Sequence, residues 1–235
     1  MTAGDAVHPA WPSAFDDFAY RWHDVRYSPV PTAWCPAFEE AERSTRALQR
    51  AGEWVTGPAS LLGVLDRRRA ETTHSRILAW LLDPEMGHRL GDRVFRAVLT
   101  MVAPNVRLTH DAPVSVVEEE AALDPMSGRI GAVDIVARAA GLTVVIENKI
   151  WSGETNDQLD RYANHYAEEQ AILVYLTPGG RPPSPQRESA SQWVPLSWRR
   201  DLLPTLSRIA SAATAEGRHC SALDDYVVAL REEFG

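Results

Sequence analysis

Cysteine is almost absent from this sequence: Cys35 and Cys220 are the only two among 235 residues. Two cysteines are too few for a disulfide framework or a cysteine-ligated metal centre, and such low usage is typical of the reducing cytosol. No run of 18 or more apolar residues occurs, which excludes a transmembrane helix by composition. Residues 1–12 lack the basic stretch and apolar core of a secretion signal. These absences predict a cytoplasmic protein without a membrane partner.

Positive charge is also scarce, with 24 Lys and Arg against 32 Asp and Glu, a formal net charge of -8. The overall field of an acidic protein does not steer it toward phosphate backbones. A nucleic-acid surface must therefore be a local basic patch, or a partner subunit must supply it. Arg67-Arg68-Arg69 and Arg199-Arg200 are candidates for such a patch, although solvated helix faces carry similar runs. The sequence contains no internal repeat and no Walker-type phosphate loop.

The overall composition is that of a globular chain long enough to bury a sizeable core, with 45% hydrophobic and 24% charged residues. Residues 1–57 are rich in proline and aromatics, with helical patterns near residues 13–25 and 37–55 and no catalytic signature. We expect them to form a helical extension packed on the core. Residues 58–235 are expected to form the principal domain.

Helical and strand patterns alternate along residues 58–235. We expect helices near residues 72–82, 93–102, 158–166, 199–213 and 222–234, and strands near residues 106–120, 134–136, 144–149, 172–176 and 193–196. A short apolar strand that follows a crossover helix is expected to run parallel to its partner. These elements predict an α/β fold, with a central mixed β-sheet flanked by helices. At the end of the first strand, alternation places Glu118 and Glu120 on one face.

A β-hairpin is predicted where two β-branched runs, residues 134–136 and 144–149, flank a break that contains Gly141. With the turn at Ala140-Gly141, paired residues have numbers that sum to 281. That register places Asp134 directly opposite Glu147.

The hairpin carries an unusual set of charges for a sheet. Glu147 and Lys149 are two residues apart and share a face, so two carboxylates and one ammonium converge near Asp134. Like charges opposite each other destabilise a sheet, and a hard divalent cation such as Mg²⁺, which prefers oxygen ligands, would offset them. An exposed edge hairpin with ordinary surface charges remains the alternative.

The same residues resemble the active site of the PD-(D/E)XK nuclease superfamily. There an Asp, an acidic residue and a Lys two positions later form a metal-dependent site, as do Asp134 and Ile146-Glu147-Asn148-Lys149 here. Gly131-Ala132-Val133 precedes Asp134, so the nominal proline of the signature is absent, as it often is in the superfamily.

The resemblance extends over residues 61–175, about half of the chain. Gly153-Glu154 and Gln158-Leu159-x-x-Tyr162 resemble the QxxxY-type helix that follows the lysine strand. Glu71-x-x-His74-Ser75-Arg76, continuing to Asp83-Pro84, is similar to the opening helix of a stand-alone prokaryotic branch. The resemblance implies a restriction-endonuclease-like core.

It also implies roles for the hairpin residues. Asp134, Glu147 and the backbone carbonyl of Asn148 would hold one or two Mg²⁺ or Mn²⁺ ions. Lys149 would orient or help to deprotonate the attacking water and offset charge at the phosphate, and Gln158 would be an accessory contact near Lys149.

Further residues enter the site only through the resemblance. Glu71 would supply another acidic group, and His74, Arg76 and Tyr162 would contact substrate. From the residues alone, Glu71 is better explained as a helix-start carboxylate favoured by the dipole, and His74 as a hydrogen-bonded packing residue.

The function implied is metal-dependent hydrolysis of nucleic acid, DNA more than RNA, in prokaryotic defence against foreign DNA. A homodimer or a partner protein of a defence system would fit this role. Two alternatives stay open: a catalytically silent nuclease-like module that binds a partner protein, and a hydrolase of a small nucleotide phosphoester.

Overall fold

The structure is a computed structural model that describes residues 34–53, 57–109, 111–123, 128, 130–153, 157–169 and 171–235. The helix expected near residues 13–25 and the motif residue Glu154 lie outside these ranges. Two units divide the chain, residues 1–57 and 58–235. In the first, helix α2 (Trp34–Arg50) is amphipathic, and its Phe38 and Leu48 are exposed.

The second unit is built on a mixed sheet, which in the described residues has five strands in the order β1-β2-β3-β4-β5. β1 (Val114–Leu123), β2 (Ile130–Ala139) and β3 (Leu142–Asn148) form an antiparallel meander. β4 (Ile172–Thr177) and β5 (Trp193–Ser197) then continue the sheet in parallel with β3. The α/β class and the parallel pairing after the crossover helix are both confirmed.

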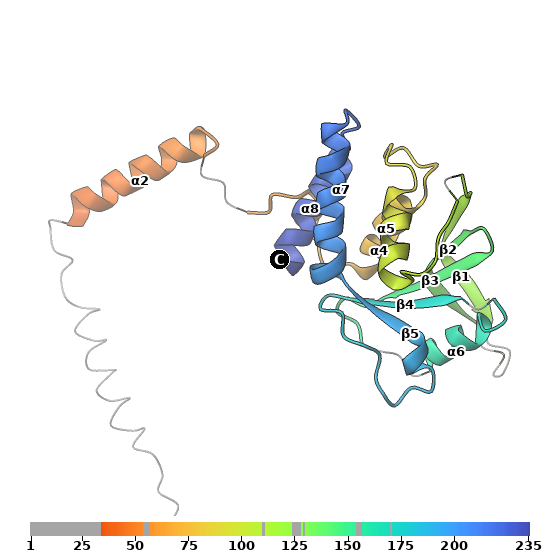
Figure 1. The fold of residues 1–235 in the computed structure, drawn as a ribbon. Helices are drawn as coiled ribbons and strands as arrows, with labels where there is room; N and C mark the ends of the chain where they lie inside the picture. The colour runs from red at the N-terminus through yellow and green to blue at the C-terminus, as the bar shows by residue number, and fades with distance from the viewer. Residues whose placement is uncertain are drawn as a thin grey trace, which may run out of the picture. The chain divides into compact units, whose positions relative to one another are not determined.

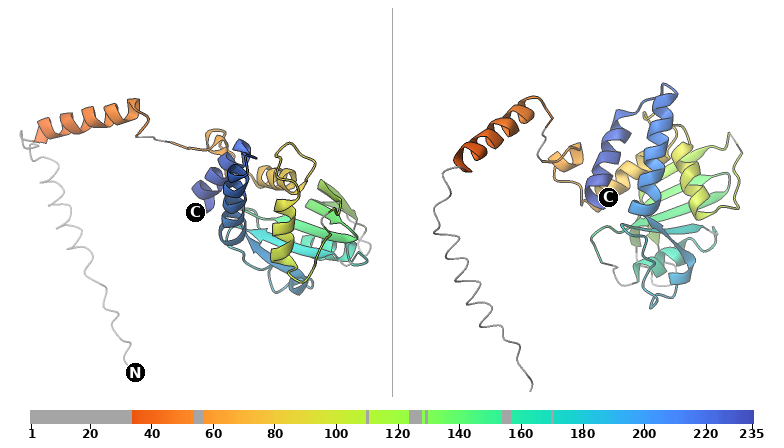
Figure 2. Two further views of the ribbon diagram at one scale, coloured as in Figure 1. Left: turned by 45° about the horizontal axis from the view of Figure 1, so that its top comes forward. Right: turned by 60° about the vertical axis from the view of Figure 1, so that its left-hand side comes forward.

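Helices cover both faces of this sheet (Figures 1 and 2). One face packs against α4 (Glu71–Leu82), α5 (Arg93–Val102), α7 (Leu203–Ala215) and α8 (Ser221–Phe234), and the other packs against α6 (Gln158–His165). Shorter segments are α3 (Leu61–Val64), the 3-10 turn η1 (Ala190–Gln192) and the π-helical turn η2 (Trp198–Leu202). None of the described helices is long and apolar enough to cross a membrane.

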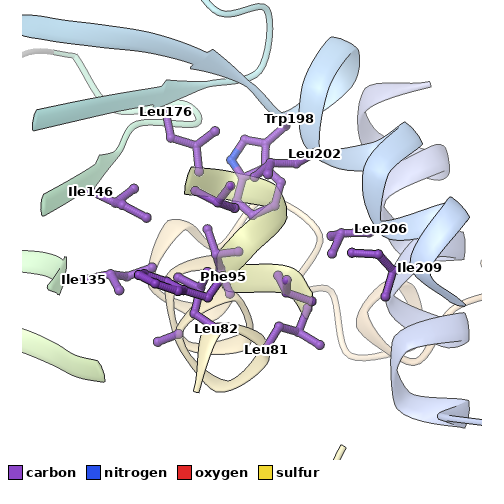
Figure 3. Packing of buried hydrophobic residues seen from close by; sticks show 14 of the residues in the cluster. Leu81, Leu82, Phe95, Ile135, Ile146, Leu176, Trp198, Leu202, Leu206 and Ile209 are labelled. Carbon is purple, nitrogen blue, oxygen red and sulfur yellow. The ribbon is translucent and has the colours of Figure 1, made fainter. Parts of the chain in front are cut away.

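The larger core lies between the sheet and the four-helix layer, as Figure 3 shows. Ile135, Ile146 and Leu176 contribute from three neighbouring strands, while Phe95 and Trp198 come from α5 and η2. The alternation of β3 divides its side chains between this core and the smaller α6 core, which receives Val145. A strand buried on both faces is a rigid support for charged groups at its end.

The β2–β3 hairpin has the predicted register, since Ile135 pairs with Ile146 and Val136 with Val145. Ala140 and Gly141 form its turn with φ of 50° and 79°. Positive φ at both central residues is the requirement of a type I′ turn, whose twist matches that of the strands. The turn therefore sets the register that brings Asp134 to the end of β3.

The first strand departs from prediction in two ways. It begins at Val114, after Pro113, whereas the pattern predicted a start near residue 106. The guanidinium of Arg96 on α5 donates to the carbonyls of Leu108 and Thr109. Those carbonyls are thus satisfied by a side chain, without a strand partner, which sequence alternation does not reveal.

The second departure concerns the glutamates of β1, which do not share a face. Glu118 pairs with Arg76 of α4, whereas Glu120 accepts hydrogen bonds from Arg138 and from Tyr166, which follows α6. Glu119 between them has φ of 50°, which interrupts the alternation of an extended strand. The prediction was wrong because one backbone torsion reverses the side on which the next residue lies.

Candidate active site

The candidate site lies where β3 ends, at the sheet edge shared by the carboxyl ends of parallel β3, β4 and β5. Ligand sites of open α/β sheets commonly occupy this edge. Asp134 comes from β2, Glu147 from β3, Lys149 from the residue after β3, and Glu71 from the first turn of α4. The structure thus brings together four of the residues predicted for the site.

Glu147 and Lys149 form a close ion pair, with 2.7 Å between Nζ and Oε1. The Glu147 side chain is only 1% exposed, and neither of its carboxylate oxygens has a hydrogen bond of acceptable geometry. Lys149 Nζ also lies 3.5 Å from Oε1 of Glu71. One ammonium therefore stands between two carboxylates, and the more deeply buried one is left short of partners.

Burial dominates the electrostatics of this cluster. It raises the pKa of Glu147 to about 8, and the negative charge of Asp134 adds to the rise. Burial likewise raises the pKa of Asp134 to about 6. For Lys149, burial alone would lower the pKa, but the charges of Glu147, Glu71 and Asp134 together outweigh it and raise that pKa. The carboxylates of the cluster thus outnumber the ammonium of Lys149.

Asp134 sits at a break in the sheet. Its Oδ2 accepts a hydrogen bond of 2.7 Å from the backbone N–H of Asn148, which ties β2 to the end of β3. On the other side, the β1–β2 pairs flank the position of Glu119, the residue with positive φ. The charge of Glu119 is one of those that raise the pKa of Asp134. Alternation alone did not indicate this role for Glu119.

Glu71 fixes the loop that carries Lys149. Its Oε2 accepts from the backbone N–H of Ile150 at 2.8 Å, and both oxygens accept from the Ser152 hydroxyl at 2.7 and 2.9 Å. Ser152 was not predicted for the site, because a lone serine in a loop carries no sequence signal. Glu71 is thus a positioning group for the loop as well as an acidic neighbour of Lys149.

Asn148 faces the opposite side of the sheet from Glu147, as strand alternation requires. Its amide nitrogen donates to the Ser75 hydroxyl at 3.1 Å and to the backbone carbonyl of Glu71 at 3.2 Å. Its Oδ1 accepts from the indole of Trp198 at 2.9 Å. The side chain joins α4 and η2 to the sheet, so a metal role for Asn148 concerns its backbone carbonyl, as predicted from the resemblance.

Gln158 and Tyr162 act together at the start of α6. Gln158 Nε2 donates to the Tyr162 hydroxyl at 3.0 Å, and that hydroxyl donates to the carbonyl of Ala132 at 2.6 Å. The Tyr162 ring also fills the space beside Gly131, where a Cβ would come within 2.9 Å of the ring. The pair therefore anchors α6 to the strand that carries Asp134.

The structure does not bring His74 or Arg76 to the cluster. His74 is fully buried, its Nδ1 is 2.8 Å from the Tyr226 hydroxyl, and its Nε2 is 2.7 Å from the carbonyl of Arg68. Burial lowers its pKa, so the neutral ring is favoured. Arg76 is exposed on α4 and pairs with Glu118. Both residues of the opening helix therefore have structural partners away from the carboxylates.

The donor set suits a hard divalent cation. Two carboxylates and a backbone carbonyl are the oxygen ligands that Mg²⁺ and Mn²⁺ accept, with waters or phosphate oxygens completing the shell. Within the described ranges no cluster of three or more His, Cys, Asp or Glu side chains is arranged to hold a metal, so protein side chains would supply part of the shell. The buried Glu147 carboxylate without hydrogen bonds is the observation that supports the fit.

Comparison with protein-family models matches residues 61–227, about seven tenths of the chain, to the PD-(D/E)XK nuclease superfamily. The match includes all of the predicted site residues, from Glu71 to Tyr162. Searches of curated proteins and of solved structures returned no match. On the family match, together with the sheet and the predicted Asp, Glu and Lys at one edge of it, the chain belongs to the PD-(D/E)XK nuclease superfamily.

Proposed function

We propose that this protein is a divalent-metal-dependent phosphodiesterase that hydrolyses nucleic acid, with DNA as the preferred polymer. The observation that carries the proposal is the buried Glu147 carboxylate, which has one ion pair and no hydrogen bond and lies within the field of Asp134. A buried carboxylate whose single partner is one ion pair costs stability. A fold that keeps one beside a second carboxylate is suited to a bound cation.

Asp134, Glu147 and the Asn148 carbonyl would hold Mg²⁺ or Mn²⁺, which when bound lowers the pKa of a coordinated water and stabilises charge on a phosphate. Lys149, paired with Glu147 and Glu71, would place its ammonium near the phosphate and orient the attacking water. Glu71 and the Gln158–Tyr162 pair would hold the Lys149 loop and β2 in place. Positioned charge of this kind is the main source of catalysis in phosphoryl transfer.

Lys149 has a further distinction, because it is the only lysine in the sequence while the other 23 basic residues are arginines. An ammonium is a compact charge, whereas a guanidinium is a wide planar fork. The ion pair with a nearly inaccessible carboxylate suits the smaller group. This usage supports a specific role for the ammonium at the site.

Positive charge near the site supports a polymeric substrate. Arg67, Arg68 and Arg69 lie just before α4, separated from its first residue, Glu71, by the N-cap residue Ala70. Arg199 and Arg200 follow β5, at the same sheet edge as the end of β3. Local basic groups of this kind would attract a phosphate backbone despite the net charge of -8. A role in defence against foreign DNA, with a second copy or a partner protein, rests on family analogy.

The proposal is tested by cleavage of plasmid, linear and single-stranded DNA and of RNA with Mg²⁺ or Mn²⁺. Wild type is compared with Asp134→Ala and Lys149→Ala, and with Glu85→Ala as an exposed acidic control outside the cluster. Metal-dependent cutting that is lost in the first two variants and kept in the control, and that is abolished by a chelator, is expected. Metal binding without cutting of any polymer would indicate a small phosphoester substrate, and no metal binding would indicate a partner-binding module.

A further inference from the structure

A large aromatic side chain is exposed beside the candidate site. Trp151 is 60% exposed and stands two residues after Lys149, within about 7 Å along the backbone. Glu71 holds the residues on both sides of it, through the Ile150 N–H and the Ser152 hydroxyl. The carboxylate that neighbours Lys149 therefore also fixes the position of the exposed indole.

Arg69 stacks on this indole. Its guanidinium carbon lies 4.9 Å from the centroid of the Trp151 ring, within the range of a cation–π contact. Nε of Arg69 is 3.1 Å from Oε1 of Glu233 on α8, which orients the guanidinium, while its side chain stays 74% exposed. Arg67 and Arg68 add charge to the same turn. The result is a pre-positioned aromatic and basic surface.

Burial of a core does not explain this arrangement, because the indole keeps most of its surface in water. Sites for single-stranded nucleic acid combine basic groups that follow the phosphates with aromatic rings on which bases stack. A base in a duplex is already paired and stacked, and its removal costs a few kcal/mol. An exposed ring next to a phosphate site therefore favours a substrate whose base is already free.

We propose that Trp151 and Arg69 form a stacking platform for an unpaired base next to the scissile phosphate, so that the enzyme prefers single-stranded DNA or frayed ends to intact duplex. This inference rests on the proposed function, because it takes the carboxylate cluster as the phosphate site. Trp151 thus selects the substrate by its strandedness, and the carboxylate cluster performs the hydrolysis.

The test measures equilibrium binding in a chelator, where no cutting occurs, by fluorescence anisotropy of a labelled single-stranded oligonucleotide and of the matching blunt duplex. Wild type is compared with Trp151→Ala, Trp151→Phe, Arg69→Ala and Phe38→Ala. Phe38 is the matched control, because it is equally exposed at 63% but belongs to the first unit. Circular dichroism verifies that each variant is folded.

Trp151→Ala is expected to weaken single-strand binding by roughly 5- to 150-fold, the range of one base–aromatic stack. Trp151→Phe should lose less single-strand affinity than Trp151→Ala. The affinity of Arg69→Ala should lie between those of wild type and Trp151→Ala, and Phe38→Ala should bind as tightly as wild type. Duplex affinity should change by less than about twofold. A 2-aminopurine base in the single strand should be quenched by wild type and not by Trp151→Ala.

If Trp151→Ala lost the same affinity for single strand and duplex, or lost affinity for neither, the stacking-platform proposal would be contradicted. The proposed function is judged separately, by metal-dependent cutting in the wild type. If wild type cuts nucleic acid and Trp151→Ala keeps the wild-type ratio of single-strand to duplex cutting, the nuclease proposal stands and the platform fails. If wild type neither binds nor cuts any polymer, both fail.

Discussion

Two carboxylates on the α6 side of the sheet, the half-buried Glu120 and the buried Glu147, have opposite environments. Glu120 receives a bidentate pair of hydrogen bonds from Arg138, at 2.6 and 2.7 Å, and a third from the Tyr166 hydroxyl at 2.9 Å. Glu147 has an ion pair with Lys149 and no hydrogen bond. Both oxygens of Glu120 thus accept hydrogen bonds in a structural network, whereas the carboxylate of Glu147 has the Lys149 ammonium as its one ion-pair partner among the described residues.

The pKa values of the two carboxylates are shifted in opposite directions. The hydrogen bonds from Arg138 lower the pKa of Glu120, while burial raises that of Glu147 to about 8. A satisfied carboxylate stabilises the fold, and an unsatisfied one costs stability and is retained where function requires it. The comparison separates the charges that hold the sheet together from those that are available for chemistry.

The largest effect is expected for the single lysine. Both Lys149→Ala and Lys149→Arg should reduce metal-dependent cleavage by at least about 100-fold, because a positioned charge in a water-poor site is worth several kcal/mol. Steady-state cleavage rates beside thermal melts provide the measurement. Glu120→Gln serves as the contrasting variant and should keep its turnover. An arginine variant with full activity would show that any cation suffices.

Glu147→Gln should stabilise the metal-free protein. The folded-state pKa of Glu147, about 8, lies above its ordinary value of 4.5. The fold therefore favours the neutral carboxyl of Glu147. The stability that this preference contributes is fully present below pH 4.5 and is lost as pH rises through 8. The stability of the variant relative to wild type should therefore rise by about 4 kcal/mol between pH 4.5 and pH 8.5.

Urea titrations of both proteins in a chelator measure this difference. Saturating Mn²⁺ should reduce it, because a bound cation stabilises the wild-type carboxylate. A difference that is constant from pH 4.5 to 8.5 would contradict the assignment of Glu147 as the unsatisfied group.

Glu120→Gln should have the reverse effect and destabilise the fold by about 1–2 kcal/mol, since it removes charge-assisted hydrogen bonds from Arg138 and Tyr166. The pKa of Glu120 is lowered in the folded state, so its contribution is present above pH 4.5 and is lost as pH falls. Chemical denaturation at pH 7 and pH 3.5 should show the difference shrinking at the lower pH. A pH-independent loss would point to packing instead of charge.

The smallest change is expected at Gly131, where an added Cβ would lie 2.9 Å from the Tyr162 ring and 3.0 Å from its hydroxyl oxygen. Gly131→Ala should shift the ring, weaken its hydrogen bond to Ala132 and cost about 1 kcal/mol. Activity should fall modestly, because β2 carries Asp134. Thermal melts and cleavage rates of Gly131→Ala and Tyr162→Phe, which should behave alike, provide the check.

Much of the site could be anticipated because its residues are close in sequence within one hairpin. The two-residue turn sets the register, and strand alternation then places Glu147 and Lys149 together. Glu71 was placed only through the family resemblance, and its hydrogen bonds to Ile150 and Ser152 join segments some 80 residues apart. No local pattern encodes a contact of that kind.

The sequence by itself determined the α/β class, the hairpin register and the convergence of Asp134, Glu147 and Lys149, because each follows from local periodicity and turn chemistry. Only the tertiary structure decided that Glu118 and Glu120 lie on opposite faces, that His74 belongs to the core, and that Trp151 is exposed beside Arg69. These outcomes depend on one backbone torsion and on packing between distant helices. Periodicity predicts which face of an element is apolar, but the charge or burial of a single side chain depends on what the fold places opposite it.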